Sequence, residues 1–127
     1  MFTYIPNIGV GGEDLEKSNK TEFGELLTRL IKQKKMTQSF FYSQVGITKP
    51  YFYDILAEKT SPSPEVQYKM LEILRPIQAD QDKFFDLIAK TKDDIPADIY
   101  KYLKGNNQMY KMIRKMMEEE KWHELKS

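Results

Sequence analysis

Residues 37–57 read TQSFFYSQVGITKPYFYDILA, and this stretch decides the fold. Thr37 can cap a short helix that Gly46 then ends, because glycine takes a left-handed conformation at little cost. Thr48 can cap a second helix, and Pro50 suits its first turn because an amide hydrogen there would have no helical acceptor. The stretch therefore predicts two short helices joined by a tight glycine turn.

Apolar residues recur in this stretch where a steeply crossing second helix needs interior contacts. Counting from Gln38 as position one, positions 4, 8, 10, 15 and 18 hold Phe41, Val45, Ile47, Phe52 and Ile55. On a helical wheel Phe52 and Ile55 point inward. The residues left pointing outward are Pro50, Tyr53, Asp54 and Ala57, with Lys49 on the flank. The pattern predicts a second helix with an uncovered outer face.

Working outward, the rest of the chain is helical in pattern, apart from an apolar, glycine-interrupted arm at residues 1–20. Thr21 can cap the first helix, and Glu65 opens another that is halted near Pro76. Later helices are expected over about 80–91, from about residue 94 to 104, and over about 107–122, with a stop at residues 105–106. The expected fold class is all-α, with domains at 21–76 and 77–127.

The stretch from Phe23 to Leu74 resembles the XRE/Cro-C1 family of helix-turn-helix repressors, without gaps. The resemblance is carried by Phe23-Gly24-Glu25-Leu26-Leu27, Thr37-Gln38, Gly46-Ile47-Thr48, Tyr51 through Ile55, and Pro62-Ser63-Pro64-Glu65. Residues 84–103 resemble the helical extension of one repressor-like subgroup. The resemblance implies a five-helix, lambda-repressor-like DNA-binding domain in residues 21–76 and a C-terminal helical extension.

The resemblance also implies which residues contact DNA. The helix from Thr48 to Ala57 would lie in the major groove, where base edges are distinguishable. The residues facing bases would be Lys49, Pro50, Tyr53 and Asp54. The residues binding phosphates would be Thr37, Gln38, Thr48, Lys59 and Thr60. We therefore expect a transcription regulator, a repressor that binds a palindromic operator.

Two positions depart from the family pattern. Tyr42 stands where the family has a small residue for close helix packing, so its ring must swing outward or the helices must separate. Glu58 replaces the glycine or asparagine that often ends the second helix. The second helix also carries one lysine and one aspartate, which leaves a protein-binding use of the same fold, such as an antitoxin or inhibitor from a mobile element, as the alternative.

Composition narrows the function classes. The chain has 127 residues, no cysteine and a net charge of +1, and nine basic residues against six acidic ones lie between Lys20 and Arg75. The absence of cysteine excludes disulfides and thiolate chemistry. No apolar run is long enough for a membrane span, and no signal-peptide layout is present, so we expect a cytoplasmic protein. The basic excess sits in the segment with the two short helices.

The last predicted helix supplies an apolar stripe. Residues at three- and four-residue spacing suit either ordinary core or a dimer interface. The candidates for a homodimer interface are Met109, Met112, Ile113, Met116 and Trp122. We expect a dimer, because two recognition helices one DNA turn apart read a palindrome.

Nothing in the sequence predicts catalysis or a small-molecule ligand. His123 is the only histidine, so a metal site is not expected, and no cofactor is expected. The acidic residues near 93–98 suit a helix start better than acid–base chemistry. The sequence predicts a protein that is not an enzyme and whose partners are double-stranded DNA and a second copy of itself.

Overall fold

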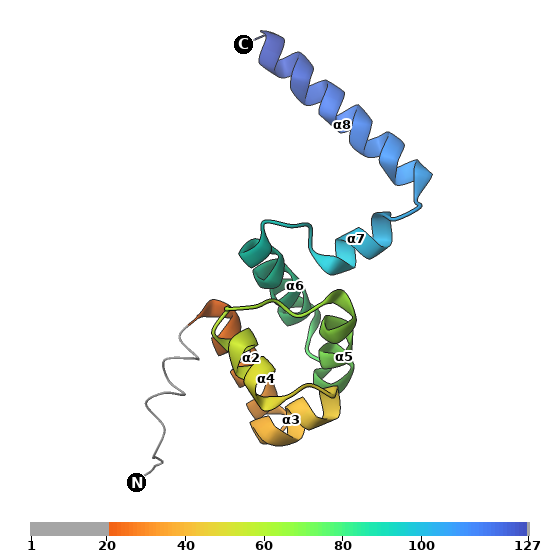
Figure 1. Cartoon of the computed structure of the whole chain (residues 1–127). Helices are drawn as coiled ribbons and strands as arrows, with labels where there is room; N and C mark the ends of the chain where they lie inside the picture. The colour runs from red at the N-terminus through yellow and green to blue at the C-terminus, as the bar shows by residue number, and fades with distance from the viewer. Residues whose placement is uncertain (1–20, 127) are drawn as a thin grey trace. The chain divides into compact units, whose positions relative to one another are not determined.

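The computed structural model describes residues 21–126, with side chains for residues 21–121. The predicted arm, residues 1–20, lies outside the described residues. The described part of the chain is all-α, with seven helices and no strand (Figure 1). The helices are α2 (Glu22–Gln33), α3 (Gln38–Val45), α4 (Lys49–Leu56), α5 (Pro64–Leu74), α6 (Gln78–Lys92), α7 (Ala97–Leu103) and α8 (Asn107–Lys126).

Hydroxyl side chains begin the first four of these helices. Thr21, Thr37, Thr48 and Ser63 are the N-caps of α2, α3, α4 and α5, and each hydroxyl accepts a hydrogen bond from the amide three residues further on. A cap of this kind satisfies an amide that has no partner within the helix. The three starts predicted at threonines are confirmed, and α5 begins at Pro64, one residue before the predicted Glu65.

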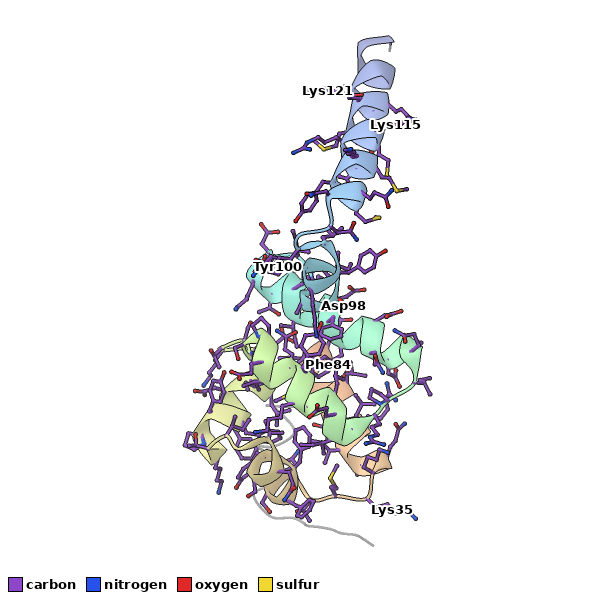
Figure 2. All side chains as sticks on the ribbon, turned by 90° about the vertical axis from the view of Figure 1, so that its right-hand side faces the viewer. Lys35, Phe84, Asp98, Tyr100, Lys115 and Lys121 are labelled. Atoms are coloured by element: carbon purple, nitrogen blue, oxygen red, sulfur yellow. The ribbon has the colours of Figure 1, made fainter. Side chains whose placement is uncertain are left out.

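The chain divides into two compact units, and the first ends at Asp94. The expected first domain, residues 21–76, stops short of this boundary, because α6 belongs to the first unit. Phe84 of α6 is fully buried, and its ring lies 5.3 Å from that of Phe23 on α2. Figure 2 shows Phe84 among the helices of this unit. The unit therefore needs α6 to complete its core.

Helix α2 lies at the centre of the first unit and contacts α3, α4 and α6, while α5 contacts α3. The largest fully buried side chains come from all five helices and the loop before α5. They are Phe41, Phe52, Phe84, Leu27, Ile31, Ile55, Leu56, Met70, Leu74 and Pro62. Burial of these side chains, at about 1.5–3 kcal/mol each, is the main favourable term for this unit. Two of them, Phe52 and Ile55, belong to α4 and anchor its inner face in the core.

The second unit begins at Ile95 and contains α7 and α8. Its two helices are separated by a turn in which Gly105 has φ +75°, a left-handed conformation that glycine adopts readily. The Gly105 amide donates to the Tyr110 hydroxyl at 2.7 Å, and the Met109 amide donates to the Asn106 side chain at 3.1 Å. The predicted stop at residues 105–106 is thus confirmed. Within residues 21–126, no helix combines the length and apolarity that crossing a bilayer requires.

Candidate functional site

Helices α3 and α4 are joined by a tight turn at Gly46. This residue has φ +87°, and its amide donates to the carbonyl of Tyr42 at 3.0 Å and to that of Ser43 at 3.1 Å. The Ile47 amide also donates to Tyr42, at 3.0 Å. A side chain at position 46 would be strained in this left-handed conformation, so the glycine keeps the turn short. The predicted glycine turn is confirmed.

Aromatic packing holds the inner face of α4. Phe52 is fully buried, and its ring centroid lies 6.1 Å from that of Phe41 and 5.3 Å from that of Tyr42. Tyr42 is half-buried, so its ring leans on Phe52 at the edge of the helix pair instead of entering the core. This is how the fold admits a large residue at a position where a small one was expected. Ile47, expected inside, is also only half-buried.

The outer face of α4 is open over most of its length. Lys49, Pro50 and Asp54 are exposed. Tyr53, the fourth residue expected on this face, is half-buried instead, because its ring packs edge-on against Phe52 at 5.3 Å. The face therefore offers a partner the ammonium group of Lys49, the carboxylate of Asp54 and the apolar ring of Pro50.

Tyr53 links α4 to α3. Its hydroxyl donates a hydrogen bond to Oε1 of Gln38, at 3.1 Å. Burial raises the pKa of Tyr53 above its ordinary value. A phenol is protonated at neutral pH even at its ordinary pKa of about 10, so the hydroxyl acts as the donor. With its oxygen engaged, Gln38 presents its amide nitrogen, a hydrogen-bond donor, at the first turn of α3. The sequence analysis predicted that both residues contact DNA, but it did not predict this bond.

The first turns of α3 and α4 carry no acidic residue. The first turn of α8 carries none either, whereas α2, α5, α6 and α7 each have at least one acidic residue in the first turn. A helix N-terminus carries a partial positive charge, which an acidic side chain would offset. The start of α3 at Thr37 and the start of α4 at Thr48 are therefore left electropositive, as an anion-binding surface requires.

The segment after α4 contains the remaining predicted phosphate contacts. Lys59 is exposed and Thr60 is half-buried. The Lys59 amide donates to the Asp54 carbonyl at 2.9 Å, which folds the chain back at the end of the helix. The structure thus places Lys59 at the C-terminal end of α4, and Thr37 and Gln38 at the start of α3.

Glu58 has a role that the sequence did not predict. It sits in the left-handed region, with φ +58°. Its Oε2 accepts a hydrogen bond from the Phe23 amide at 3.3 Å, and its Oε1 accepts one from the Thr91 hydroxyl at 3.3 Å. Because it lies at the N-terminus of α2, the carboxylate also meets the positive end of that helix. The departure from the family pattern at position 58 was the signal that could have revealed this role.

Phe40 is a second feature that the sequence did not single out. It is the third residue of α3, two residues after Gln38, and is 52% exposed. An aromatic ring of this exposure provides an apolar contact for a partner. No local pattern marked Phe40, because adjacent apolar residues are both buried elsewhere in this unit, as Leu26 and Leu27 are.

The residues predicted for a dimer interface lie on α8. Met112 and Met116 are exposed, whereas Met109 and Ile113 are half-buried. Trp122 belongs to α8, but its side chain lies outside the described residues. Met117, which the candidate set left out, is exposed beside them. All five candidates therefore belong to one helix, and the side chains of four of them are described.

Comparisons with known proteins do not assign the chain to a family. No family model, no curated protein and no solved structure matches the chain. What can be assigned is a small all-helical domain with an exposed helix face. Among residues 21–121 there is also no group of three or more metal-ligating side chains that could hold an ion.

Proposed function

We propose that this protein is a sequence-specific, double-stranded DNA-binding transcription regulator. In this proposal α3 and α4 form a helix-turn-helix of the lambda-repressor type, and α4 enters the major groove. The observation that carries the proposal is that α4 has a buried inner face and an exposed outer face. Phe52 and Ile55 fix it from beneath, while Lys49, Pro50 and Asp54 stay exposed.

The chemistry of the exposed face suits base edges. The Lys49 ammonium donates to the guanine acceptors O6 and N7, and the Asp54 carboxylate accepts from the cytosine amino group. Pro50 offers only apolar contact, for example with a thymine methyl group. Tyr53 sits beside these residues as a positioning residue, because its hydroxyl is engaged by Gln38.

Phosphate contacts would fix the helix in the groove. The acid-free N-termini of α3 and α4 supply amides and a positive dipole end for phosphate oxygens. Thr37, Gln38 and Thr48 lie at these ends, and Lys59 and Thr60 follow α4. Contacts of this kind give position and affinity, whereas the face of α4 gives sequence preference.

The regulator is proposed to be a repressor that occupies a palindromic operator as a dimer. A two-fold protein presents two α4 helices to half-sites one helical turn apart. The α8 stripe, with Met112 and Met116 exposed, supplies apolar surface for such a dimer. The resemblance of residues 23–74 to the XRE/Cro-C1 repressors supports the same function.

A gel-shift assay on duplex DNA flanking the gene for this chain tests the proposal. The unmodified protein should bind, and its affinity should fall steeply with salt. Gln38→Ala and Lys59→Ala should each weaken binding to all sequences alike, and Lys59→Ala should lower the salt slope by about one. Lys83→Ala, an exposed lysine on α6, is the control and should leave binding unchanged. Failure to bind any duplex at low salt would reject the proposal.

A second candidate function is protein binding through α3 and α4, as in an antitoxin or inhibitor. The exposed Phe40 favours it, because large aromatic residues are enriched in protein interfaces. In that case the protein encoded by a neighbouring gene should co-purify with the chain. Phe40→Ala should release that protein, and the duplex-binding assay should be negative.

A further inference from the structure

Most of the exposed apolar surface in the described part of the chain lies in the second unit. Of the nine large hydrophobic residues exposed there, seven belong to this unit: Ile95, Ile99, Tyr100, Tyr102, Met112, Met116 and Met117. Helix α7 has no buried residue. The unit is also shorter than the roughly 40 residues that a segment needs to build its own core. It therefore requires a partner surface.

Helix α8 concentrates this apolar surface on one face. Met109, Met112, Ile113, Met116 and Met117 follow the three- and four-residue spacing that makes a stripe. Met112, Met116 and Met117 are 57%, 61% and 55% exposed. Lys111 and Glu118 lie on the opposite side of the helix by the same spacing. The stripe is thus an exposed face of adaptable methionines, and it ends at Glu120, which lies on the same face four residues after Met116.

Charges beside the stripe specify what covers it. Lys115 and Glu119 are four residues apart and flank the same edge of the stripe; the side chain of Lys115 is visible on α8 in Figure 2. In an antiparallel two-fold pair, this edge of one helix runs against the same edge of the other in the reverse direction. Each Lys115 then lies beside Glu119 of the second copy.

The same charges disfavour other arrangements. A parallel two-fold pair would instead set this edge against the opposite edge of the other helix, which carries Arg114 and Lys121, so Lys115 would lie beside Arg114 of the second copy and be repelled. The midpoint between these residues is Met117, within one residue of the middle of α8, Asn107–Lys126. The register that pairs the charges therefore also overlaps the two helices along their full length.

We propose that α8 pairs with α8 of a second copy of this chain in an antiparallel, two-fold arrangement that crosses at Met116 and Met117. The pairing buries the methionine stripe against itself and forms two Lys115–Glu119 contacts between copies. It deepens the dimeric part of the proposed function by naming the interface, and it does not depend on DNA binding.

Cross-linking of single-cysteine variants tests the orientation, because the full chain has no cysteine. Met116→Cys lies near the two-fold axis and should link two copies on oxidation. Met109→Cys lies on the same stripe but far from its equivalent, so it should not. Glu118→Cys, close to the crossing but on the opposite face, is the matched control and should stay unlinked. Linking of Met109→Cys as readily as Met116→Cys would show a parallel pair and overturn the proposal.

Sedimentation of the full chain without DNA tests the interface itself. The unmodified protein should be a dimer, and Met116→Glu should raise its dissociation constant about tenfold or more, whereas Lys111→Glu, on the opposite face, should not. Lys115→Glu should weaken the dimer, and adding Glu119→Lys to it should restore the affinity. A monomeric unmodified chain would overturn the proposal even if it shifts DNA. A dimer that fails to shift DNA would reject the proposed function alone.

Discussion

The carboxylate of Glu58 accepts a hydrogen bond from the main-chain amide of Phe23, 35 residues earlier in the chain, with Oε2 and N 3.3 Å apart. A second hydrogen bond joins the same two helix ends: the Thr21 hydroxyl donates to the Leu56 carbonyl at 2.7 Å. Together these bonds tie the C-terminal end of α4 to the N-terminal end of α2. They hold in place the helix whose outer face we propose to read DNA.

Replacement of Glu58 should separate its two effects on stability. Glu58→Ala removes the capping carboxylate but keeps a non-glycine residue at φ +58°, so the free energy of unfolding should fall by about 1–2 kcal/mol. Glu58→Gly also removes the carboxylate but relieves the left-handed strain, worth about 1 kcal/mol. Urea denaturation should therefore rank the alanine variant below the glycine variant. A glycine variant more stable than the unmodified protein by the full strain energy would show that the cap contributes nothing.

Removal of the Tyr53 hydroxyl should affect both folding and binding. Tyr53→Phe keeps the ring against Phe52 but loses the bond to Gln38, so stability should fall by about 0.5–1.5 kcal/mol. Binding to all duplexes should weaken to the same extent, because Gln38 loses its orientation while the base-reading groups are unchanged. Tyr51→Phe is the control, since the described structure shows no hydrogen bond of its hydroxyl. A change in base preference would assign Tyr53 to base reading instead.

Lys49 and Asp54 should determine which bases are preferred. Lys49→Ala and Asp54→Ala should each relax the preference at one position of the half-site, by about 1–3 kcal/mol per lost contact. Selection from a randomised duplex pool, followed by sequencing, measures the change. Lys59→Ala serves as the comparison and should lower affinity without altering the selected sequence. An unchanged selected sequence in all three variants would remove the outer face of α4 from the reading surface.

The first unit should require α6 for folding. Phe84→Ala leaves a cavity beside Phe23, so it should cost about 3–5 kcal/mol in urea denaturation. A fragment of residues 21–94 should unfold cooperatively, whereas a fragment of residues 21–76 should lack a cooperative transition. Cooperative unfolding of the shorter fragment would show that α6 is dispensable.

The Arg29–Asp80 pair should give a pH-dependent contribution to stability. Arg29 donates two hydrogen bonds to Asp80, at 3.0 and 3.3 Å, and this lowers the pKa of the carboxyl in the folded protein. A lowered pKa means that the contribution is present above the pKa of a free aspartate, about 3.9, and is lost as the pH falls through the folded value.

Asp80→Asn measures this contribution. The variant should be less stable than the unmodified protein at pH 7, and the difference should shrink below about pH 4. Asp86→Asn is the control on the same helix, because the described structure shows no hydrogen bond or ion pair of its carboxyl. A difference between Asp80→Asn and the unmodified protein that stays constant down to pH 2 would contradict the assignment.

Much of the local structure could be predicted from the sequence, because its causes are local. A threonine hydroxyl caps a helix through an amide three residues away, so Thr21, Thr37 and Thr48 marked their helices correctly. Apolar spacing likewise placed Phe52 and Ile55 inside. The last helix, expected to end near residue 122, continues to Lys126, since no residue there imposes an end.

The tertiary structure decided what depends on residues far apart in the chain. The amide that Glu58 meets lies 35 residues away, and the side chain that Tyr53 meets lies 15 residues away. Neither contact has a local pattern, because each exists only once three-dimensional packing has brought two helices together. The sequence by itself determined where the threonine-capped helices α2, α3 and α4 begin, the glycine turn, and the exposure of Lys49, Pro50 and Asp54 on α4. Packing decided that α6 completes the core, that Tyr53 turns toward Gln38, and that Glu58 caps a distant helix.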